Sequence, residues 1–406
     1  MKILWVNPHF LHPTTKGGQI RTLEMLRHLH RWHEIHYVAL VDTRATGDAP
    51  EGLARSPEYS TRAYAIPHRL PERGSLAFIA QSAGNLFSDL PLAVSRYQSA
   101  AMRNKVQDLV EHGGFDRLVC DFLFAAPNVP DLEHSVLFQH NVESTIWQRH
   151  SQNAGNPAAK AFFSLQAKRM VAYEDQVCRR SGHIIAVSTT DADRMREMFG
   201  VSRVSDVPTG VDLDYFAPVE TGASHSSDLV FVGSMDWLPN IDAVQYFVAD
   251  ILPLIRKTKP DCTVAIVGRK PQHNILALAK NDPGIIVTGT VPDVRPYFWG
   301  SSISIVPLRI GGGTRLKIYE AMAARSPVVS TTVGAEGLPI SSGETCYLAD
   351  DPQDFADRCL ELLADEDRRK RMAQAAWELV STWFSWEHAS RRFEQILENA
   401  PAVTGS

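Results

Sequence analysis

Short apolar runs typical of strands alternate with longer helical stretches along the chain, and this alternation restricts the fold more than any other feature. In the first half, the predicted strands cover residues 2–6, 35–41, 117–120, 135–139 and 183–187. The predicted helices cover residues 20–32, 101–111 and 158–180. Strands and helices that alternate in this way form βαβ units, in which helices cover both faces of a parallel sheet. We therefore expect an α/β fold.

The second half repeats the pattern. Its predicted strands cover residues 229–232, 263–267, 285–288, 303–307 and 328–330, and its predicted helices 241–255, 316–324, 368–382 and 386–399. A chain of 406 residues is long for one hydrophobic core, whereas two domains of about 200 residues are common. We therefore predict two facing Rossmann-like domains, with ligands bound at the carboxyl ends of the strands in an interdomain cleft.

The boundary between the halves is expected at residues 206–218, where Pro208, Gly210 and Pro218 interrupt both the strand and the helix periodicity. The sequence thus predicts an N-terminal domain over residues 1–205, a hinge over 206–218 and a C-terminal domain over 219–383. We expect a last helix within residues 384–406 to pack back toward the N-terminal domain.

Composition excludes several classes of protein. The sequence contains no apolar run of the roughly 18 residues that a membrane span needs, and no signal peptide is visible, so we expect a cytoplasmic protein. The five cysteines are dispersed without C-x-x-C spacing, which argues against a disulfide framework or a zinc site. The net charge is -5 and neither half is strongly basic, so a nucleic-acid partner is not expected.

A glycine-rich turn before the predicted helix 316–324 has the chemistry of a phosphate site. Glycines let the backbone approach an anion closely, and the first turn of a helix presents unpaired N–H groups. An arginine and a lysine add formal charge. The predicted anion site comprises Gly312, Gly313, Thr314, Arg315 and Lys317. The alternative is an ordinary glycine turn before an amphipathic helix whose cations are solvated.

Two strand ends in the first half carry further candidates. Gly17 and Gly18 precede a predicted helix and could offer N–H groups to a phosphate, although a simple loop explains them equally well. His140, Asn141 and Glu143 follow the strand at 135–139. Side chains of this kind hydrogen-bond sugar hydroxyls or steady a reacting oxygen, and strand ends are where such folds place them.

Strand ends in the second half leave room for a flat base and its ribose. Gly233, Gly268 and Val291 lie in these segments. Arg269 is predicted to cover the base or to approach the phosphates, and the equal alternative is a solvated pair with Lys270.

Two Asp-x-Asp pairs have a spacing that can hold Mg²⁺, namely Asp191 with Asp193 and Asp212 with Asp214. The first pair is typical of a helix N-terminus and the second lies in the predicted hinge. We therefore predict no metal site.

With these residues assembled, the chain resembles glycosyltransferases of the GT-B fold, and most closely family 4 of the nucleotide-sugar-dependent glycosyltransferases. The resemblance rests on Lys16-Gly17-Gly18, on the segment 208–216, and most specifically on Glu320-Ala-Met-Ala-Ala-Arg-Ser-Pro327. It implies a UDP-sugar or GDP-sugar donor and a glycan, lipid-linked or small-molecule acceptor. It also implies retention of configuration, no metal or other cofactor, and a place in polysaccharide or glycoconjugate biosynthesis.

The resemblance also implies roles for single residues. Glu320 would be the second Glu of the Glu-x7-Glu motif and hold the donor ribose, and His140 would lie near the reacting sugar, so these two are the predicted catalytic residues. Gly17 and Gly18 would meet the donor phosphates. The N-terminal domain would be the acceptor side, which includes Asn141 and Glu143.

Two departures from the family pattern are visible. Gly312 stands where the first Glu of the motif is expected, and the segment 233–240 lacks the Arg and Lys that commonly bind the diphosphate. We hypothesise that Arg315 and Lys317 replace this charge.

Three alternatives stay open. A nucleotide-sugar epimerase uses the same two-domain fold, and a non-catalytic nucleotide- or glycan-binding protein would tolerate the missing Glu. Residues 62–103 mix aromatic and Arg side chains. This segment favours an inserted helix pair that packs on the core over a peripheral contact with the inner face of a membrane and a lipid-linked acceptor.

Overall fold

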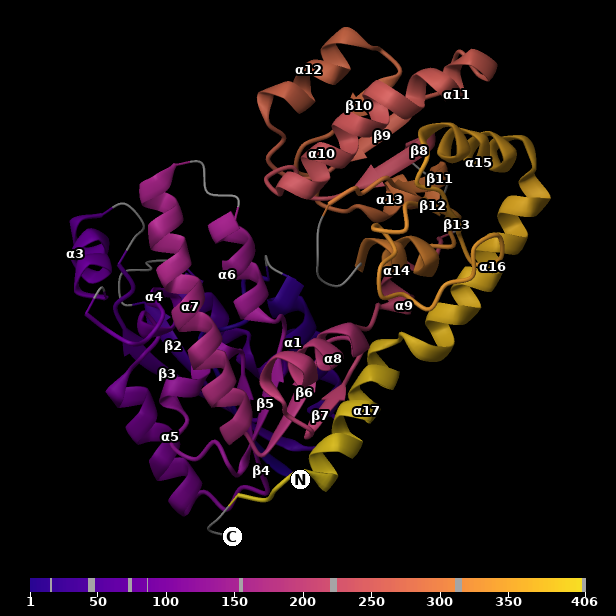
Figure 1. Ribbon diagram of the computed structural model, residues 1–406. Helices are drawn as coiled ribbons and strands as arrows, with labels where there is room; N and C mark the ends of the chain where they lie inside the picture. Colours follow the sequence, from indigo (N-terminus) through magenta and orange to yellow (C-terminus); the bar gives the residue numbers. More distant parts are fainter. Residues whose placement is uncertain are drawn as a thin grey trace. The chain divides into compact units, whose positions relative to one another are not determined.

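The computed structural model describes residues 1–14, 17–42, 48–71, 75–85, 87–152, 156–219, 225–310 and 316–403, with residues 48–50 described without their side chains. The chain forms two compact units, drawn in Figure 1. Unit 1 comprises Met1–Pro208 and Ala389–Ser406, and unit 2 comprises Thr209–His388. The chain passes from one unit to the other inside the segment 206–218, and the last helix contributes residues to both.

Unit 1 contains a seven-stranded parallel sheet in the order β3-β2-β1-β4-β5-β6-β7. Its strands are β1 (Lys2–Asn7), β2 (Glu34–Asp42), β3 (Arg62–His68), β4 (Arg117–Asp121), β5 (Ser135–Gln139), β6 (His183–Ala186) and β7 (Val204–Asp206). The strand order reverses between β1 and β4. In a doubly wound sheet this point opens a crevice at the carboxyl ends of the two strands.

The helices of unit 1 connect these strands. They are α1 (Gly17–Leu29), α2 (Asp48–Ala54), η1 (Ser56–Glu58), α3 (Leu76–Asn85), α4 (Leu92–Ser95), α5 (Ala100–His112), η2 (Leu123–Asn128), α6 (Glu143–Gln152), α7 (Pro157–Arg180) and α8 (Thr189–Phe199). The last helix, α17 (Trp386–Asn399), joins them through Phe393, whose ring stacks on Trp5 of β1 at 5.5 Å. Arg117 donates to the carbonyl of Glu398 at 2.8 Å.

Unit 2 contains a six-stranded parallel sheet in the order β10-β9-β8-β11-β12-β13. Its strands are β8 (Ser227–Val232), β9 (Val264–Val267), β10 (Ile285–Val287), β11 (Ser301–Val306), β12 (Val328–Ser330) and β13 (Tyr347–Leu348). Its helices are α9 (Leu213–Phe216), α10 (Leu238–Tyr246), η3 (Phe247–Ile251), α11 (Leu252–Thr258), α12 (His273–Asn281), α13 (Arg295–Trp299), α14 (Leu316–Ala323), α15 (Pro352–Ala364) and α16 (Glu366–Trp383). Here the order reverses between β8 and β11.

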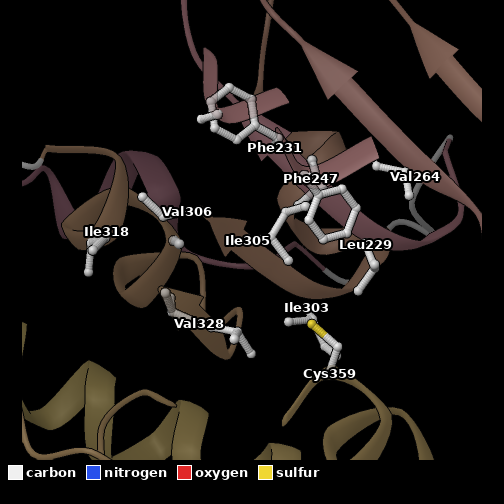
Figure 2. Close-up of a cluster of buried hydrophobic side chains, with 14 of the residues drawn as sticks. Leu229, Phe231, Phe247, Val264, Ile303, Ile305, Val306, Ile318, Val328 and Cys359 are labelled. Atoms are coloured by element: carbon white, nitrogen blue, oxygen red, sulfur yellow. The ribbon is translucent and has the colours of Figure 1, made fainter. Parts of the chain in front are cut away.

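The core of unit 2 is built from the strands and from the helices that cover them (Figure 2). Phe231 and Phe247 lie with strand residues such as Val264 and Ile305, all of them buried. The five cysteines are free and buried. Within the described residues, no helix combines the length and the apolar character needed to cross a membrane.

The α/β prediction is confirmed, and three of its details are wrong. Residues 62–68 form strand β3 rather than part of a helix pair, because small alanines on one face of this edge strand weaken the apolar signal and an edge tolerates Pro67. The short edge strands β7 and β13 were not predicted. A single helix was expected at 241–255. In the structure the π-helical segment η3 interrupts it, next to Pro253, which has no N–H to donate.

Candidate functional site

In unit 1, Asp121 is the last residue of β4 and lies where the strand order reverses between β1 and β4. Its buried carboxylate accepts four hydrogen bonds: from Trp5 Nε1 at 2.9 Å, Asn7 Nδ2 at 2.6 Å, Thr22 Oγ1 at 2.8 Å and His140 Nε2 at 2.6 Å. These donors come from β1, α1 and the segment after β5. Asp121 therefore ties together the carboxyl ends of three strands and the first turns of α1.

His140 lies at the end of β5, as predicted, and both of its ring nitrogens are engaged. Arg21 Nη1 donates to Nδ1 at 3.0 Å, so Nε2 carries the proton that is donated to Asp121. Burial lowers the pKa of His140, and the nearby Arg21 cation lowers it further, against the opposing effect of Asp121. The imidazole ring stacks on the Phe122 ring, with the ring centres 3.8 Å apart, and the tilted Phe138 ring lies 4.4 Å away. His140 is thus a neutral imidazole in a fixed orientation.

Phe122 covers His140 and has a strained backbone. Its φ is 68°, a left-handed conformation that costs energy for a residue with a Cβ, and such strain gathers at functional sites. A methyl group on Gly18 would lie 2.7 Å from the Phe122 ring, so Gly18 permits the ring to approach α1. Sequence analysis missed Arg21, Asp121 and Phe122. The strand-end signal that indicated His140 applies equally to Asp121.

Glu143 of α6 and Glu174 of α7 form a pair of buried carboxylates in unit 1. Glu174 of α7 accepts from the backbone N–H groups of Glu143 at 3.0 Å and Ser144 at 2.7 Å, which caps the start of α6. Asn141 Nδ2 donates to Glu143 Oε1 at 3.4 Å. Burial, with the charge of Glu174, raises the pKa of Glu143 to about 7.

Replacement of Glu143 by Gln should remove a pH dependence of stability. The folded-state pKa of about 7 exceeds the ordinary value of 4.5, so this carboxyl stabilises unit 1 below pH 4.5 and loses that contribution as pH rises through 7. Relative to wild type, Glu143→Gln should gain roughly 3 kcal/mol in free energy of unfolding between those limits. Urea titrations at several pH values measure this, with Glu197→Gln as the control on an exposed face of α8. A difference that stays constant with pH would contradict it.

In unit 2, Lys317 lies at the reversal point between β8 and β11. Its Nζ donates to Asn240 Oδ1 at 2.7 Å and lies 4.4 Å from the centre of the Phe231 ring. Asn240 is buried, and its Nδ2 donates to the carbonyl of Ser234 at 2.8 Å. A methyl group on Gly233 would lie 2.9 Å from Lys317 Nζ. Lys317 of α14 is therefore directed to the end of β8. The segment that follows β8 lacks the Arg and Lys of the family pattern noted above.

The segments after β8 and β9 are joined. A methyl group on Gly268 would lie 1.9 Å from the Gly233 carbonyl oxygen. Arg269 Nε donates to Ser234 Oγ at 3.2 Å, and its guanidinium forms an ion pair with Asp236 at 3.5 Å. The structure thus brings three predicted residues, Gly233, Gly268 and Arg269, together with Lys317.

Glu320 follows Lys317 by one turn of α14. Partial burial of its carboxyl raises the pKa to about 7, and the Lys317 cation lowers it only in part. Val291 lies after β10, partly buried against the hydrophobic core. Gly17 opens α1, and a methyl group there would have no atom within 4 Å. Four predicted residues, Gly312, Gly313, Thr314 and Arg315, lie outside the described residues.

The two Asp-x-Asp pairs have local structural roles. The N–H of Asp191 donates to Ser188 Oγ at the start of α8, and Asp193 pairs with Arg196 at 2.6 Å. Asp212 accepts from the N–H of Tyr215 at 2.8 Å and so caps α9. The first pair thus marks a helix N-terminus, as predicted.

Part of the chain is similar to a known protein family. Residues 226–365 match the family described as glycosyl transferases group 1. A D-inositol 3-phosphate glycosyltransferase from Nocardioides sp. is 27% identical over 257 residues. That alignment covers 56% of this chain and 56% of the relative, so the chain spans little more than half of the relative's length.

Solved structures match the whole fold. A sucrose-phosphate synthase from Thermosynechococcus elongatus has a TM-score of 0.68 and 16% sequence identity, with 98% of both chains covered. HepE from Anabaena, in complex with UDP, has a TM-score of 0.63 and 12% identity, with 98% of this chain and 100% of that chain covered. The two parallel sheets and these neighbours show that the chain has the GT-B fold, and residues 226–365 within it match the glycosyl transferases group 1.

Proposed function

We propose that the protein transfers a sugar from a nucleoside diphosphate donor, a UDP-sugar or GDP-sugar, to a glycan, lipid-linked or small-molecule acceptor. Transfer retains the anomeric configuration and needs no metal. The observation that supports this most is the position of Lys317, whose ammonium group lies at the end of β8 where the sheet order of unit 2 reverses. Doubly wound sheets bind nucleotides at such a point.

The chemistry requires charge stabilisation on the leaving group. The bond between the anomeric carbon and the diphosphate oxygen breaks, and negative charge builds on the diphosphate. A preorganised cation stabilises this charge without reorganisation during the reaction. In this proposal Lys317 supplies that cation with Arg315, and Glu320 accepts a hydrogen bond from the donor ribose. The solved structure of HepE with UDP supports a nucleoside diphosphate ligand for this fold.

On the acceptor side, the proposal gives Asp121, Arg21 and His140 a positioning role. Both ring nitrogens of His140 are bonded to protein groups, so His140 orients the Phe122 ring that covers it. The partly exposed Phe122, together with Asn141, then faces the reacting sugar or the acceptor.

Replacement of Lys317 by Ala should weaken the binding of a nucleoside diphosphate by about 1.5–3 kcal/mol, because a charge-assisted bond is lost. Arg315→Ala should have a similar effect. Isothermal calorimetry with UDP and GDP measures the affinity. Lys257→Ala is the matched control, an exposed lysine on α11 of the same unit. Affinities of the two variants that equal that of the control would defeat the assignment.

The reaction itself is tested with UDP-, GDP- and dTDP-sugars, each with and without candidate acceptors. Release of nucleoside diphosphate that depends on an acceptor supports a transferase. An isomerised donor sugar would support the epimerase alternative, and binding without turnover would support a non-catalytic protein. Glu320→Gln should lower turnover, while unit 2 should melt at or above the wild-type temperature near neutral pH, because the raised pKa of Glu320 means that the fold disfavours its charged form.

A further inference from the structure

Asn240 of α10 holds the ammonium group of Lys317. Its Oδ1 accepts from Lys317 Nζ at 2.7 Å, and its Nδ2 donates to the carbonyl of Ser234 at 2.8 Å. Asn240 is only 3% exposed, and a buried amide is stable in such a place because both of its polar ends are bonded. Lys317 and Ser234 thus lie at the two polar ends of one fixed side chain.

The segment that carries Ser234 is itself fixed to the sheet of unit 2. The N–H of Gly233 donates to the carbonyl of Val267, the last residue of β9, at 2.9 Å. Hydrogen bonds therefore connect the end of β9 to the segment after β8, and Asn240 extends this connection to α14. A lysine has a long, flexible stem, so its ammonium group gains a defined position from a partner that is held in this way.

Two further contacts restrict the position of the ammonium group. It lies 4.4 Å from the centre of the ring of Phe231, a buried residue of β8 that is labelled in Figure 2. An aromatic face attracts a cation without neutralising it. A methyl group on Gly233 would lie 2.9 Å from Lys317 Nζ and 2.8 Å from Asn240 Nδ2, so the absence of a side chain at this position leaves room for the pair.

Asn240 is a neutral partner, and this matters for an anionic ligand. Other cations of unit 2 pair with carboxylates, as Arg295 does with Asp293 at 2.6 Å. A carboxylate cancels much of the charge that it binds, whereas the bond to the Asn240 amide orients the ammonium group and leaves its charge in place. The segment 233–240 has no Arg or Lys of its own, but it contributes the acceptor that receives a cation from α14.

We propose that Asn240 is a positioning residue for the diphosphate of the donor: it holds the Lys317 ammonium group at the end of β8 without cancelling its charge. The inference rests on the proposed function, because it presupposes a diphosphate ligand at this end of the sheet. Both polar ends of the Asn240 amide are bonded within unit 2, so its effect on the ligand passes through Lys317.

Isothermal calorimetry with UDP, GDP and inorganic pyrophosphate tests this role. Asn240→Ala should weaken the binding of the nucleoside diphosphate about tenfold, as expected when a charge-assisted bond is lost. The affinity for the matching nucleoside, uridine or guanosine, should be unchanged, because a nucleoside carries no phosphate for Lys317 to contact. Pyrophosphate carries no base, so its affinity reports on the cation alone and should fall with that of the diphosphate.

A double-variant cycle shows whether Asn240 acts through Lys317. Asn240→Ala combined with Lys317→Ala should bind the nucleoside diphosphate no more weakly than Lys317→Ala alone, because the group that Asn240 positions is gone. Asn240→Asp keeps the shape of the side chain and tests the same point if Asn240→Ala folds poorly. Its carboxylate cancels the charge of Lys317, so the diphosphate should again bind about tenfold more weakly or worse.

Asn128→Ala is the matched control. Asn128 is a fully buried asparagine of unit 1 whose amide also makes two hydrogen bonds. It accepts from the N–H of Ser99 at 2.8 Å and donates to the carbonyl of Tyr97 at 2.8 Å. Its replacement should lower the melting temperature, as that of Asn240 does, and leave the affinity for the nucleoside diphosphate unchanged. The control thus separates lost stability from lost positioning of the cation.

The inference is overturned if both Asn240 variants bind the diphosphate as tightly as the wild type, or if nucleoside and diphosphate lose affinity equally. It is also overturned if the losses of Asn240→Ala and Lys317→Ala add in the double variant. These results leave the proposed function standing. A wild type that binds pyrophosphate but neither UDP nor GDP contradicts the proposed donor, and the same variants then decide the role of Asn240 with pyrophosphate as the ligand. A wild type that binds none of the three overturns both.

Discussion

Replacement of Asp121 by Ala destabilises unit 1 by about 3–5 kcal/mol, the usual cost of breaking a buried, hydrogen-bonded charge network. The carboxylate accepts four hydrogen bonds, and its removal leaves the Trp5, Asn7 and Thr22 donors buried without their acceptor. The buried Arg21 guanidinium also loses a nearby negative charge. Calorimetry should show the melting transition of unit 1 lowered by on the order of 10 °C.

The control for this substitution is Asp175→Ala on the surface of α7. Asp175 pairs with Arg179 at 2.7 Å, and both side chains are partly exposed to solvent, so its removal should cost less than about 1 kcal/mol. Asp121→Asn keeps the shape but places an amide N–H₂ among donors, so its stability should fall between wild type and Asp121→Ala. The assignment of Asp121 as the central acceptor is wrong if Asp121→Ala melts like the control.

The second large effect is expected in unit 2, where Gly268→Ala should cost about 3 kcal/mol or more. The new methyl group would lie 1.9 Å from the Gly233 carbonyl oxygen and 2.7 Å from its carbon. These are backbone atoms held by the Gly233 N–H bond to the Val267 carbonyl at 2.9 Å, so the overlap cannot be relieved by a side-chain rotation. Urea unfolding measures the loss.

Gly233→Ala is the informative neighbour of this variant. Its methyl group would meet the side-chain ends of Asn240 and Lys317, at 2.8 Å and 2.9 Å, which can move. The expected cost in stability is therefore only about 1 kcal/mol, while displacement of Lys317 should weaken binding of UDP or GDP. Gly17→Ala, with no atom within 4 Å of its methyl group, controls for the loss of a glycine. Equal stabilities of Gly268→Ala and Gly17→Ala would refute the steric argument.

The strands that were predicted correctly share a physical property. The buried strands β1, β5 and β12 are continuous apolar runs, which the sequence displays directly. Edge strand β3 was missed because alanines and Pro67 occupy positions at which a central strand would carry large apolar side chains. The composition of a strand thus indicates whether the strand is buried more directly than it indicates whether the strand pairs with a neighbour in the sheet.

For the candidate sites, too, the sequence indicated some features directly and others only became visible in the structure. Strand-end position led to His140, Gly233, Gly268 and Arg269, because parallel strands gather their carboxyl ends at one edge. It did not reveal which groups contact each other. Asp121 is 19 residues from His140 and Asn240 is 77 residues from Lys317, and sequence spacing carries no information about such pairs.

By itself, the sequence determined an α/β chain of two Rossmann-like halves, in which the segment around Glu320 resembles a glycosyltransferase motif. Periodicity and local motifs decide these features, since they depend on residues close together along the chain. Only the tertiary structure decided that Asp121 fixes a neutral His140, that Lys317 lies at the end of β8, and that Leu76 and Ile79 of α3 are exposed to solvent. Each of these depends on which distant segments pack together and which face they leave exposed.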